Sequence, residues 1–158
     1  MNILVTGGAG FIGRWVVKRL VEDKHSVWIL DNLSNGSLDN IEDLLQKYPS
    51  LTFVKGDIKE NKLLEDLFYN KFEICYHLAA SINVQDSIDD PKTTFENDVV
   101  GTFNLLQQCR LSGTKFVYMS TCMVYSKANS ESGISEQHPT CPASPYAAAK
   151  LAGEELAL

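Results

Sequence analysis

The stretch Thr6-Gly7-Gly8-Ala9-Gly10-Phe11-Ile12-Gly13 decides the fold, because its glycines fall at positions 7, 10 and 13. The apolar run Ile3-Leu4-Val5 comes just before it and predicts a strand buried on both faces. Apolar residues at helical spacing continue after it as far as Leu20. Such glycines permit a tight turn, let backbone N–H groups approach a pyrophosphate, and allow the helix to pack closely on the strand. The stretch therefore predicts a strand, a phosphate-binding turn and a helix whose N-terminus faces the bound anion.

The rest of the chain repeats this change between short apolar runs and helical stripes. Strands are expected over 3–5, 26–30, 51–54, 74–78 and 116–119, and helices over 11–20, 39–48, 61–68, 93–111 and from 146 to 158. The apolar stripes include Phe11 and Trp15 in the first helix and Phe95 and Phe103 in the fourth. This alternation predicts βαβ units, and hence an α/β fold with a doubly wound parallel sheet around the first strand.

Length and composition limit the kind of protein. The chain has 158 residues, 44% of them hydrophobic, which suits one domain with its own core. Its 14 Lys and Arg against 20 Asp and Glu leave a formal charge of −6, which argues against nucleic acid as a partner. No apolar run approaches the ~20 residues that span a bilayer, and the N-terminus does not resemble a signal peptide. We therefore expect a cytoplasmic protein with no membrane partner, with four free cysteines and no metal site.

An acidic residue follows the second predicted strand. Asp31 stands 18 positions beyond Gly13, close to the ~20 expected for the partner of a dinucleotide ribose. Its carboxylate can accept hydrogen bonds from both ribose hydroxyls, whereas it would repel a 2′-phosphate. No Arg or Lys occurs from Asp31 to Gln46 to bind such a phosphate. The pattern therefore predicts NAD rather than NADP.

A second acidic residue follows the third predicted strand, in Gly56-Asp57-Ile58. Asp57 could meet the adenine edge while Ile58 lies behind the ring. The alternative is that Asp57 caps the next helix, and the sequence does not decide between the two.

Tyr146 and Lys150 form a Y-x-x-x-K pair at the start of the last predicted helix. The i, i+4 spacing places both side chains on one helix face, where the ammonium is expected to lower the pKa of the tyrosine toward that of a general base. Ser120 and Thr121 lie at the carboxyl end of the fifth predicted strand, the edge at which open α/β sheets bind ligands. A hydroxyl there could hydrogen-bond the substrate oxygen that the tyrosine deprotonates.

Taken together, these motifs resemble the N-terminal half of the extended short-chain dehydrogenases/reductases. The resemblance is to the nucleotide-sugar epimerase/dehydratase type, which includes UDP-glucose 4-epimerase-like proteins, and it covers essentially all 158 residues. The matching motifs, in order, are T-G-G-A-G-F-I-G, Asp31-Asn32-Leu33-Ser34, Gly56-Asp57-Ile58, His77-Leu78-Ala79-Ala80, Gly101-Thr102, Ser120-Thr121-x-x-Val124-Tyr125 and Pro145-Tyr146-x-x-x-Lys150.

The resemblance implies an NAD(P)-binding Rossmann fold and oxidation of a sugar hydroxyl by hydride transfer to the nicotinamide. It implies that Tyr146 is the base, that Lys150 lowers its pKa and holds the nicotinamide ribose, and that Thr121 is the catalytic hydroxyl. The cofactor contacts that it implies are Gly7, Gly10, Phe11, Ile12, Gly13, Asp31, Asn32, Asp57, Ile58, Leu78, Ala79, Ala80, Tyr146 and Lys150.

Three departures from the family pattern bear on function. Family members are about twice as long, so residues 1–158 are expected to form the dinucleotide-binding domain, cut within its last helix and lacking the C-terminal substrate-binding part. The 4,6-dehydratases carry Asp-Glu directly after the threonine, where this chain has Cys122 and Met123. Cys122 could either transfer a proton or pack as a small hydrophobe. The family often has Asn where this chain has Asp98.

The sequence therefore predicts an NAD-dependent nucleotide-sugar epimerase. A dehydratase or decarboxylase on the same scaffold and a non-catalytic NAD-binding fragment are the alternatives. Family members often dimerise through two long helices, so a homodimer is a further hypothesis.

Overall fold

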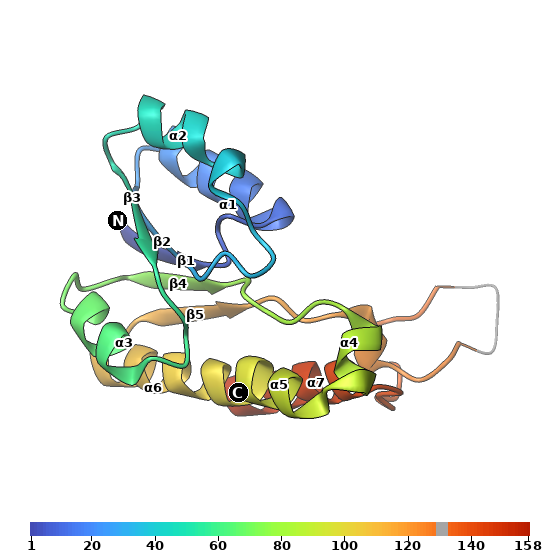
Figure 1. The fold of residues 1–158 in the computed structure, drawn as a ribbon. Helices are drawn as coiled ribbons and strands as arrows, with labels where there is room; N and C mark the ends of the chain where they lie inside the picture. The colour runs from blue at the N-terminus through green and yellow to red at the C-terminus, as the bar shows by residue number, and fades with distance from the viewer. Residues whose placement is uncertain (129–132) are drawn as a thin grey trace.

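A computed structural model describes residues 1–128 and 133–158. Its strands are β1 (Asn2–Thr6), β2 (Ser26–Asp31), β3 (Leu51–Lys55), β4 (Ile74–His77) and β5 (Lys115–Tyr118). All neighbouring strands pair in parallel, in the order β3-β2-β1-β4-β5 (Figure 1). The chain thus builds outward first on one side of β1 and then on the other, which confirms the predicted doubly wound sheet.

Helices cover both faces of this sheet. The α-helices are α1 (Phe11–Glu22), α2 (Glu42–Lys47), α3 (Asn61–Phe68), α4 (Val84–Asp89), α5 (Pro91–Phe95), α6 (Thr102–Ser112) and α7 (Pro145–Ala157). Two 3₁₀ turns, η1 (Leu38–Asn40) and η3 (Cys122–Val124), and a π-helical segment, η2 (Glu96–Gly101), complete the description. Figure 1 shows α1 and α2 on one side of the sheet and α3, α6 and α7 on the other.

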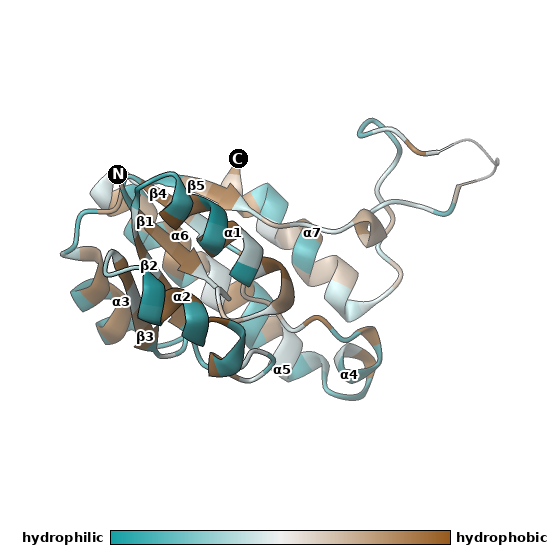
Figure 2. Cartoon of the chain, turned by 90° about the horizontal axis from the view of Figure 1, so that it is seen from above, coloured by the Kyte–Doolittle hydropathy of each residue, from teal (hydrophilic) through white to brown (hydrophobic). Residues whose placement is uncertain are grey.

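The alternation of side chains along β1 creates two separate cores. Ile3 and Val5 pack with buried residues of α1 and α2, whereas Leu4 points to the opposite face and packs with buried residues of α3 and α6. All three side chains are fully buried, and each such burial is worth roughly 2 kcal/mol. Figure 2 shows the hydrophobic colour concentrated in the strands between the flanking helices. β1 is therefore held from both faces, as its continuous apolar run predicts.

Two predicted helices are divided in the structure. The helix expected over 39–48 consists of η1 and α2, because the Ser37 side chain accepts a hydrogen bond from the Asp39 N–H at 3.2 Å and caps a separate short turn. The helix expected over 93–111 consists of α5, η2 and α6. The preceding α4 was not predicted, although Asn83 caps it by accepting from the Gln85 N–H at 2.9 Å.

The aromatic members of two predicted helical stripes lie at the surface. Phe11 is 85% exposed and Trp15 is 53% exposed, while the buried residues of α1 are Gly13, Val17 and Val21. Phe95 and Phe103 are likewise exposed. Small and β-branched residues instead form the face that approaches the sheet most closely. On the other side of α1, exposed apolar residues beside Tyr76 form an open hollow.

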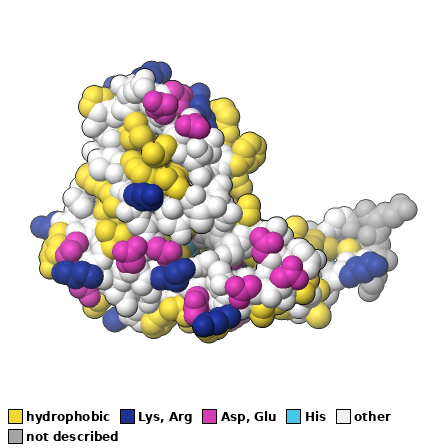
Figure 3. Space-filling model, in the orientation of Figure 1, with side chains coloured by type: hydrophobic (Ala, Val, Ile, Leu, Met, Phe, Trp, Pro, Cys, Tyr) yellow, Lys and Arg dark blue, Asp and Glu magenta, His cyan; other side chains and the backbone are white. Residues whose placement is uncertain are grey.

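The surface carries both signs of charge. Figure 3 shows Lys and Arg side chains scattered among Asp and Glu on the face that it draws. Within residues 1–128 and 133–158, no helix combines the length and the apolar character that crossing a membrane requires.

Candidate functional site

The glycine turn between β1 and α1 accepts no larger residue at two positions. Gly7 has φ +70°, and a Cβ atom there would lie 2.6 Å from the backbone nitrogen of Ala79. A Cβ atom at Gly13 would lie 2.1 Å from the carbonyl oxygen of Gly7. α1 then begins after Gly10, with no side-chain cap and no acidic residue in its first turn. Its first N–H groups are therefore available to an anion.

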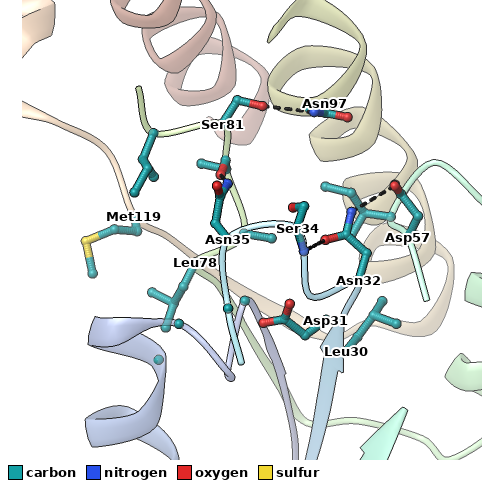
Figure 4. A pocket seen from close by; sticks show the side chains of 18 of the residues that line it. Leu30, Asp31, Asn32, Ser34, Asn35, Asp57, Leu78, Ser81, Asn97 and Met119 are labelled. Carbon is teal, nitrogen blue, oxygen red and sulfur yellow. Dashed lines mark hydrogen bonds between the residues drawn. The ribbon is translucent and has the colours of Figure 1, made fainter. Parts of the chain in front are cut away.

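Asp31, at the end of β2, is held against this turn. Its Oδ2 accepts a hydrogen bond from the Ala9 N–H at 3.0 Å, and its Oδ1 accepts one from the Leu33 N–H at 2.8 Å. The side chain is buried and faces the glycine turn (Figure 4). Each carboxylate oxygen has a further lone pair, so both can still accept from a pair of hydroxyls.

Asp57 follows β3 and faces the end of β2. Its Oδ2 accepts from Asn32 Nδ2 at 3.0 Å and lies 3.4 Å from Lys59 Nζ, while its Oδ1 accepts from the Lys59 N–H at 2.9 Å. Burial alone would raise the pKa of Asp57, but these partners together leave it lowered. Asp57 also caps the turn that leads into α3, because the Asp57 N–H donates to Glu60 Oε1 at 3.0 Å, while Glu60 is itself the N-cap residue of the helix. The structure therefore gives Asp57 both a place facing the end of β2 and a capping role before α3.

These groups surround one cavity of about 310 Å³, a size typical of small-molecule sites. It lies across the carboxyl ends of β1, β2, β3 and β4, where the strand order reverses. Its lining includes Gly7, Gly10, Phe11, Ile12, Gly13, Asp31, Asn32, Asp57, Ile58, Leu78, Ala79 and Ala80. All the predicted cofactor contacts except Tyr146 and Lys150 therefore lie around it.

Several other residues also line the cavity, although they are not among the predicted cofactor contacts: Leu30, Ser34, Asn35, Gly36, Gly56, Ser81, Ile82, Asn97, Asp98 and Met119. Ser34 and Gly56 belong to the motifs Asp31-Asn32-Leu33-Ser34 and Gly56-Asp57-Ile58, so their place just after a strand was an available signal. Asn97 comes from the helical region after α5, and its Nδ2 donates to Ser81 Oγ at 2.9 Å (Figure 4). No local pattern predicts that contact.

The two hydroxyls after β5 have different partners. Ser120 hydrogen-bonds the Glu154 carboxylate on α7. Thr121 accepts from the Met123 N–H at 3.3 Å, and its side chain also hydrogen-bonds Tyr146, which lowers the tyrosine pKa. Of the two, Thr121 is therefore the hydroxyl that the fold presents to Tyr146.

Tyr146 and Lys150 lie on α7, which Ser144 caps by accepting from the Ala147 N–H at 3.1 Å. Burial raises the pKa of Tyr146 and outweighs the opposing Thr121 hydrogen bond. The lowered tyrosine pKa expected from the i, i+4 pair is therefore wrong. Burial lowers the pKa of Lys150 to about 8, and its Nζ lies 4.3 Å from the centre of the Tyr118 ring.

Cys122 and Met123 are both exposed, in η3. The alternative that Cys122 packs as a small hydrophobe is therefore wrong. Among the described residues, no group of three or more His, Cys, Asp or Glu side chains is placed to hold a metal ion.

His77 is buried at the end of β4 and links three elements. Its Nδ1 lies 2.6 Å from Thr6 Oγ1, and its Nε2 lies 2.9 Å from Thr102 Oγ1. Thr102 donates its only hydroxyl proton to the Asp98 carbonyl oxygen at 2.7 Å. We therefore assign the His77 proton to Nε2, which leaves Nδ1 to accept from Thr6. Burial lowers the pKa of His77 to about 3, so the ring is neutral.

Comparison with known proteins gives consistent matches along the chain. The family model described as GDP-mannose 4,6 dehydratase matches residues 4–158. A UDP-glucose 4-epimerase of Mycolicibacterium smegmatis is 43% identical over 98% of this chain and 49% of its own length. The chain thus spans about half the length of the curated relatives that it matches.

Solved structures agree with this result. The crystal structure of Pal from Bacillus thuringiensis is 60% identical, with a TM-score of 0.95 over 99% of this chain and 50% of that one. A Thermus thermophilus UDP-glucose 4-epimerase, solved in complex with NAD, is 35% identical, with a TM-score of 0.90 over 98% of this chain and 49% of that one. With the family model matching nearly its whole length, the chain belongs to the epimerase/dehydratase family of extended short-chain dehydrogenases/reductases, as its motifs and parallel sheet predicted.

Proposed function

We propose that this chain is the NAD-binding part of a nucleotide-sugar epimerase. The observation that carries the proposal is the cavity at the carboxyl edge of the sheet, bounded by the open N-terminus of α1 and by Asp31. The N–H groups of α1 suit the pyrophosphate, and the two oxygens of Asp31 suit the adenosine ribose hydroxyls. NAD supplies a hydride acceptor when bound.

The cavity also suits the two ends of the cofactor. Asp57 and Asn32 lie together near the end of β3, where we place the adenine. Ser81, Asp98 and Met119 line the opposite part, on the side of β5 and α7. We place the nicotinamide there, because Asp98 also acts electrostatically on Tyr146 and Lys150.

In this proposal Tyr146 removes the proton of a sugar hydroxyl as that carbon is oxidised. Thr121 hydrogen-bonds Tyr146 and lowers its pKa against the effect of burial. In this proposal Lys150 holds the ribose next to the nicotinamide, and its positive charge opposes the effect of burial on the Tyr146 pKa once substrate is bound. Return of the same hydride to the other face of the keto sugar, with the proton given back by Tyr146, would then give the epimer.

Epimerisation is preferred to dehydration for one specific reason. Elimination of water needs an additional acid and base, and the two positions after Thr121 hold a thiol and a thioether on the surface. Dehydration and decarboxylation remain the alternatives. Mass spectrometry of the product separates them, since epimerisation leaves the mass unchanged whereas the others remove water or carbon dioxide.

The central experiment is calorimetric titration of this 158-residue chain with NAD and, separately, with NADP. We expect NAD to bind more tightly, because the Asp31 carboxylate, which in this proposal accepts from the ribose hydroxyls, would repel a 2′-phosphate. Nucleotide released from the denatured protein should be identified first, since bound cofactor would mask the heat. Equal affinity for both nucleotides would contradict the role of Asp31, and no binding by the nucleotide-free chain would contradict the proposed function.

A matched pair of variants tests the turn itself. Gly13→Ala should abolish NAD binding and cost about 3 kcal/mol of stability, because its Cβ overlaps the Gly7 carbonyl. Gly133→Ala is the control, since no atom of the described residues lies within 4 Å of a Cβ there. Retained NAD affinity in the Gly13→Ala variant would exclude the turn as the pyrophosphate site.

Two further expectations from the sequence stay proposals. A homodimer is tested by sedimentation across a wide range of concentrations, and a strict monomer at high concentration would exclude it. A cytoplasmic location rests on the sequence alone and is tested by fractionation of the source cells.

A further inference from the structure

Asp98 is a buried carboxyl with one oxygen unused. It is 2% exposed and lies in η2, against which α7 packs. The Ser81 N–H donates to its Oδ1 at 2.7 Å, but among the described residues its Oδ2 has no hydrogen-bond partner. A buried carboxylate oxygen without a partner costs free energy, so such a group is retained where a nearby cation offsets the cost.

Lys150 is a buried cation on α7, the helix that packs against η2. It is 3% exposed, and none of the ion pairs within residues 1–128 and 133–158 includes it. Its Nζ lies over the ring of Tyr118, which satisfies the charge only partly. Each group acts on the other: the Asp98 charge raises the pKa of Lys150, and the Lys150 charge lowers the pKa of Asp98.

We propose that Asp98 is the buried counter-ion of Lys150 and keeps the Lys150 ammonium charged next to Tyr146. The assignment rests on the proposed function, because it gives Asp98 a positioning role toward the pair that is expected to act on the sugar. An asparagine, which the family resemblance leads one to expect here, could accept the same Ser81 hydrogen bond but would supply no charge. Asp98 therefore adds an electrostatic function to a structural one.

Lys59 hydrogen-bonds Asn97, the neighbour of Asp98 in η2. The groups that act on the pair itself come from three elements around η2. They are Lys150, Tyr146 and Glu154 of α7, Tyr118 of β5, and His77 of β4. Glu154 also raises the pKa of Lys150, so Asp98 is one of two negative charges that support the ammonium. His77 is neutral at working pH and contributes no charge. Glu96, on η2 itself, has a half-exposed side chain and pairs with Lys92.

The signs of the two pKa shifts define a pH window. Burial raises the pKa of Asp98 to about 6, and burial lowers the pKa of Lys150 to about 8. Both groups are charged between these values. Removal of the Asp98 charge takes away an influence that raises the pKa of Lys150, so the lysine should then lose its proton at lower pH.

The test is a ¹³C NMR titration of the lysine Cε signals in this chain, with the Lys150 signal assigned from Lys150→Met. Asp98→Asn keeps an acceptor for Ser81 but removes the charge, and it should lower the pKa of Lys150 by about one pH unit. Glu96→Gln removes a half-exposed charge that pairs with Lys92 in the same segment, and it should leave the Lys150 titration in place. A purely structural role for Asp98 predicts that the pKa of Lys150 is the same in both variants as in the original chain.

An unchanged Lys150 titration in folded Asp98→Asn overturns the inference. Should that variant fail to fold, Lys150→Met supplies the reciprocal test: it should raise the pKa of Asp98 above about 6, seen in its carboxyl ¹³C signal. NAD titration of the same samples separates this inference from the proposed function. NAD binding with an unmoved Lys150 titration refutes only the counter-ion, whereas a shifted titration without NAD binding refutes only the proposed function.

Discussion

At the scale of single residues, hydrogen bonding distinguishes two hydroxyls that are adjacent in the sequence. Ser120 donates a hydrogen bond to the Glu154 carboxylate, whereas Thr121 faces Tyr146. Both side chains have the same donor and acceptor chemistry, so the motif alone ranks them only by family resemblance. The difference arises because consecutive residues leaving a strand point in different directions.

Thr121→Ala should raise the pKa of Tyr146, because the variant loses the hydrogen bond that opposes burial. The pKa can be measured from the ¹³Cζ signal of labelled tyrosine, assigned with Tyr146→Phe. Ser120→Ala is the matched control and should leave that signal unchanged. A larger effect from Ser120→Ala would reverse the assignment of the two hydroxyls.

At the scale of secondary-structure elements, a chain of hydrogen bonds ties the strand ends to the helix region that follows α5. The Ala79 N–H lies 3.4 Å from Thr6 Oγ1, which donates to His77, which in turn donates to Thr102. Thr102 donates to the carbonyl of Asp98. The cavity wall at Ala79 and the segment that carries Asp98 are thus fixed relative to each other by one buried imidazole.

This arrangement predicts a pH dependence of stability. The pKa of His77 is depressed in the folded state, so below its ordinary value of 6.5 the unfolded chain binds a proton that the folded chain does not. The contribution of His77 to the free energy of unfolding is therefore fully present above pH 6.5. It is lost as the pH falls toward 3, by up to about 1.4 kcal/mol per pH unit. Urea unfolding at several pH values measures the slope.

His77→Gln should be less stable at pH 7 and should show a correspondingly smaller loss between pH 6.5 and 4. His25→Gln is the control, because it leaves the buried imidazole in place. Identical slopes in the two variants would exclude His77 as the source of the acid sensitivity.

The element scale also shows where sequence patterns fail. The helix over 61–68 is found at its predicted bounds, because its apolar spacing, with Leu64, Leu67 and Phe68 buried, agrees with its packing. Phe103 was placed on an apolar stripe but is exposed, since α6 meets the sheet through Thr102 and Leu105. Hydrophobic spacing predicts a helix, but which side is covered depends on neighbours that are distant in the sequence.

At the scale of the whole molecule, cofactor binding should raise the free energy of unfolding of the whole chain. A ligand that binds only the folded chain adds about 2.7 kcal/mol at a concentration one hundred times its Kd. For a domain of this length we expect saturating NAD to raise the Tm by roughly 5–10 °C. NADP at the same concentration should raise it less, and an equal rise with both would contradict the selectivity assigned to Asp31. Differential scanning calorimetry provides the measurement.

The sequence by itself determined the fold class, the family and the positions of the glycine turn and Asp31. These features depend on local rules, since glycine geometry, strand periodicity and helix N-termini act within a few residues. Only the tertiary structure decided that Thr121 rather than Ser120 faces Tyr146, that burial raises the pKa of that tyrosine, and that Asp98 is buried with a free oxygen. Burial and charge–charge interactions join residues from separate elements, so their outcome exists only once the chain has folded.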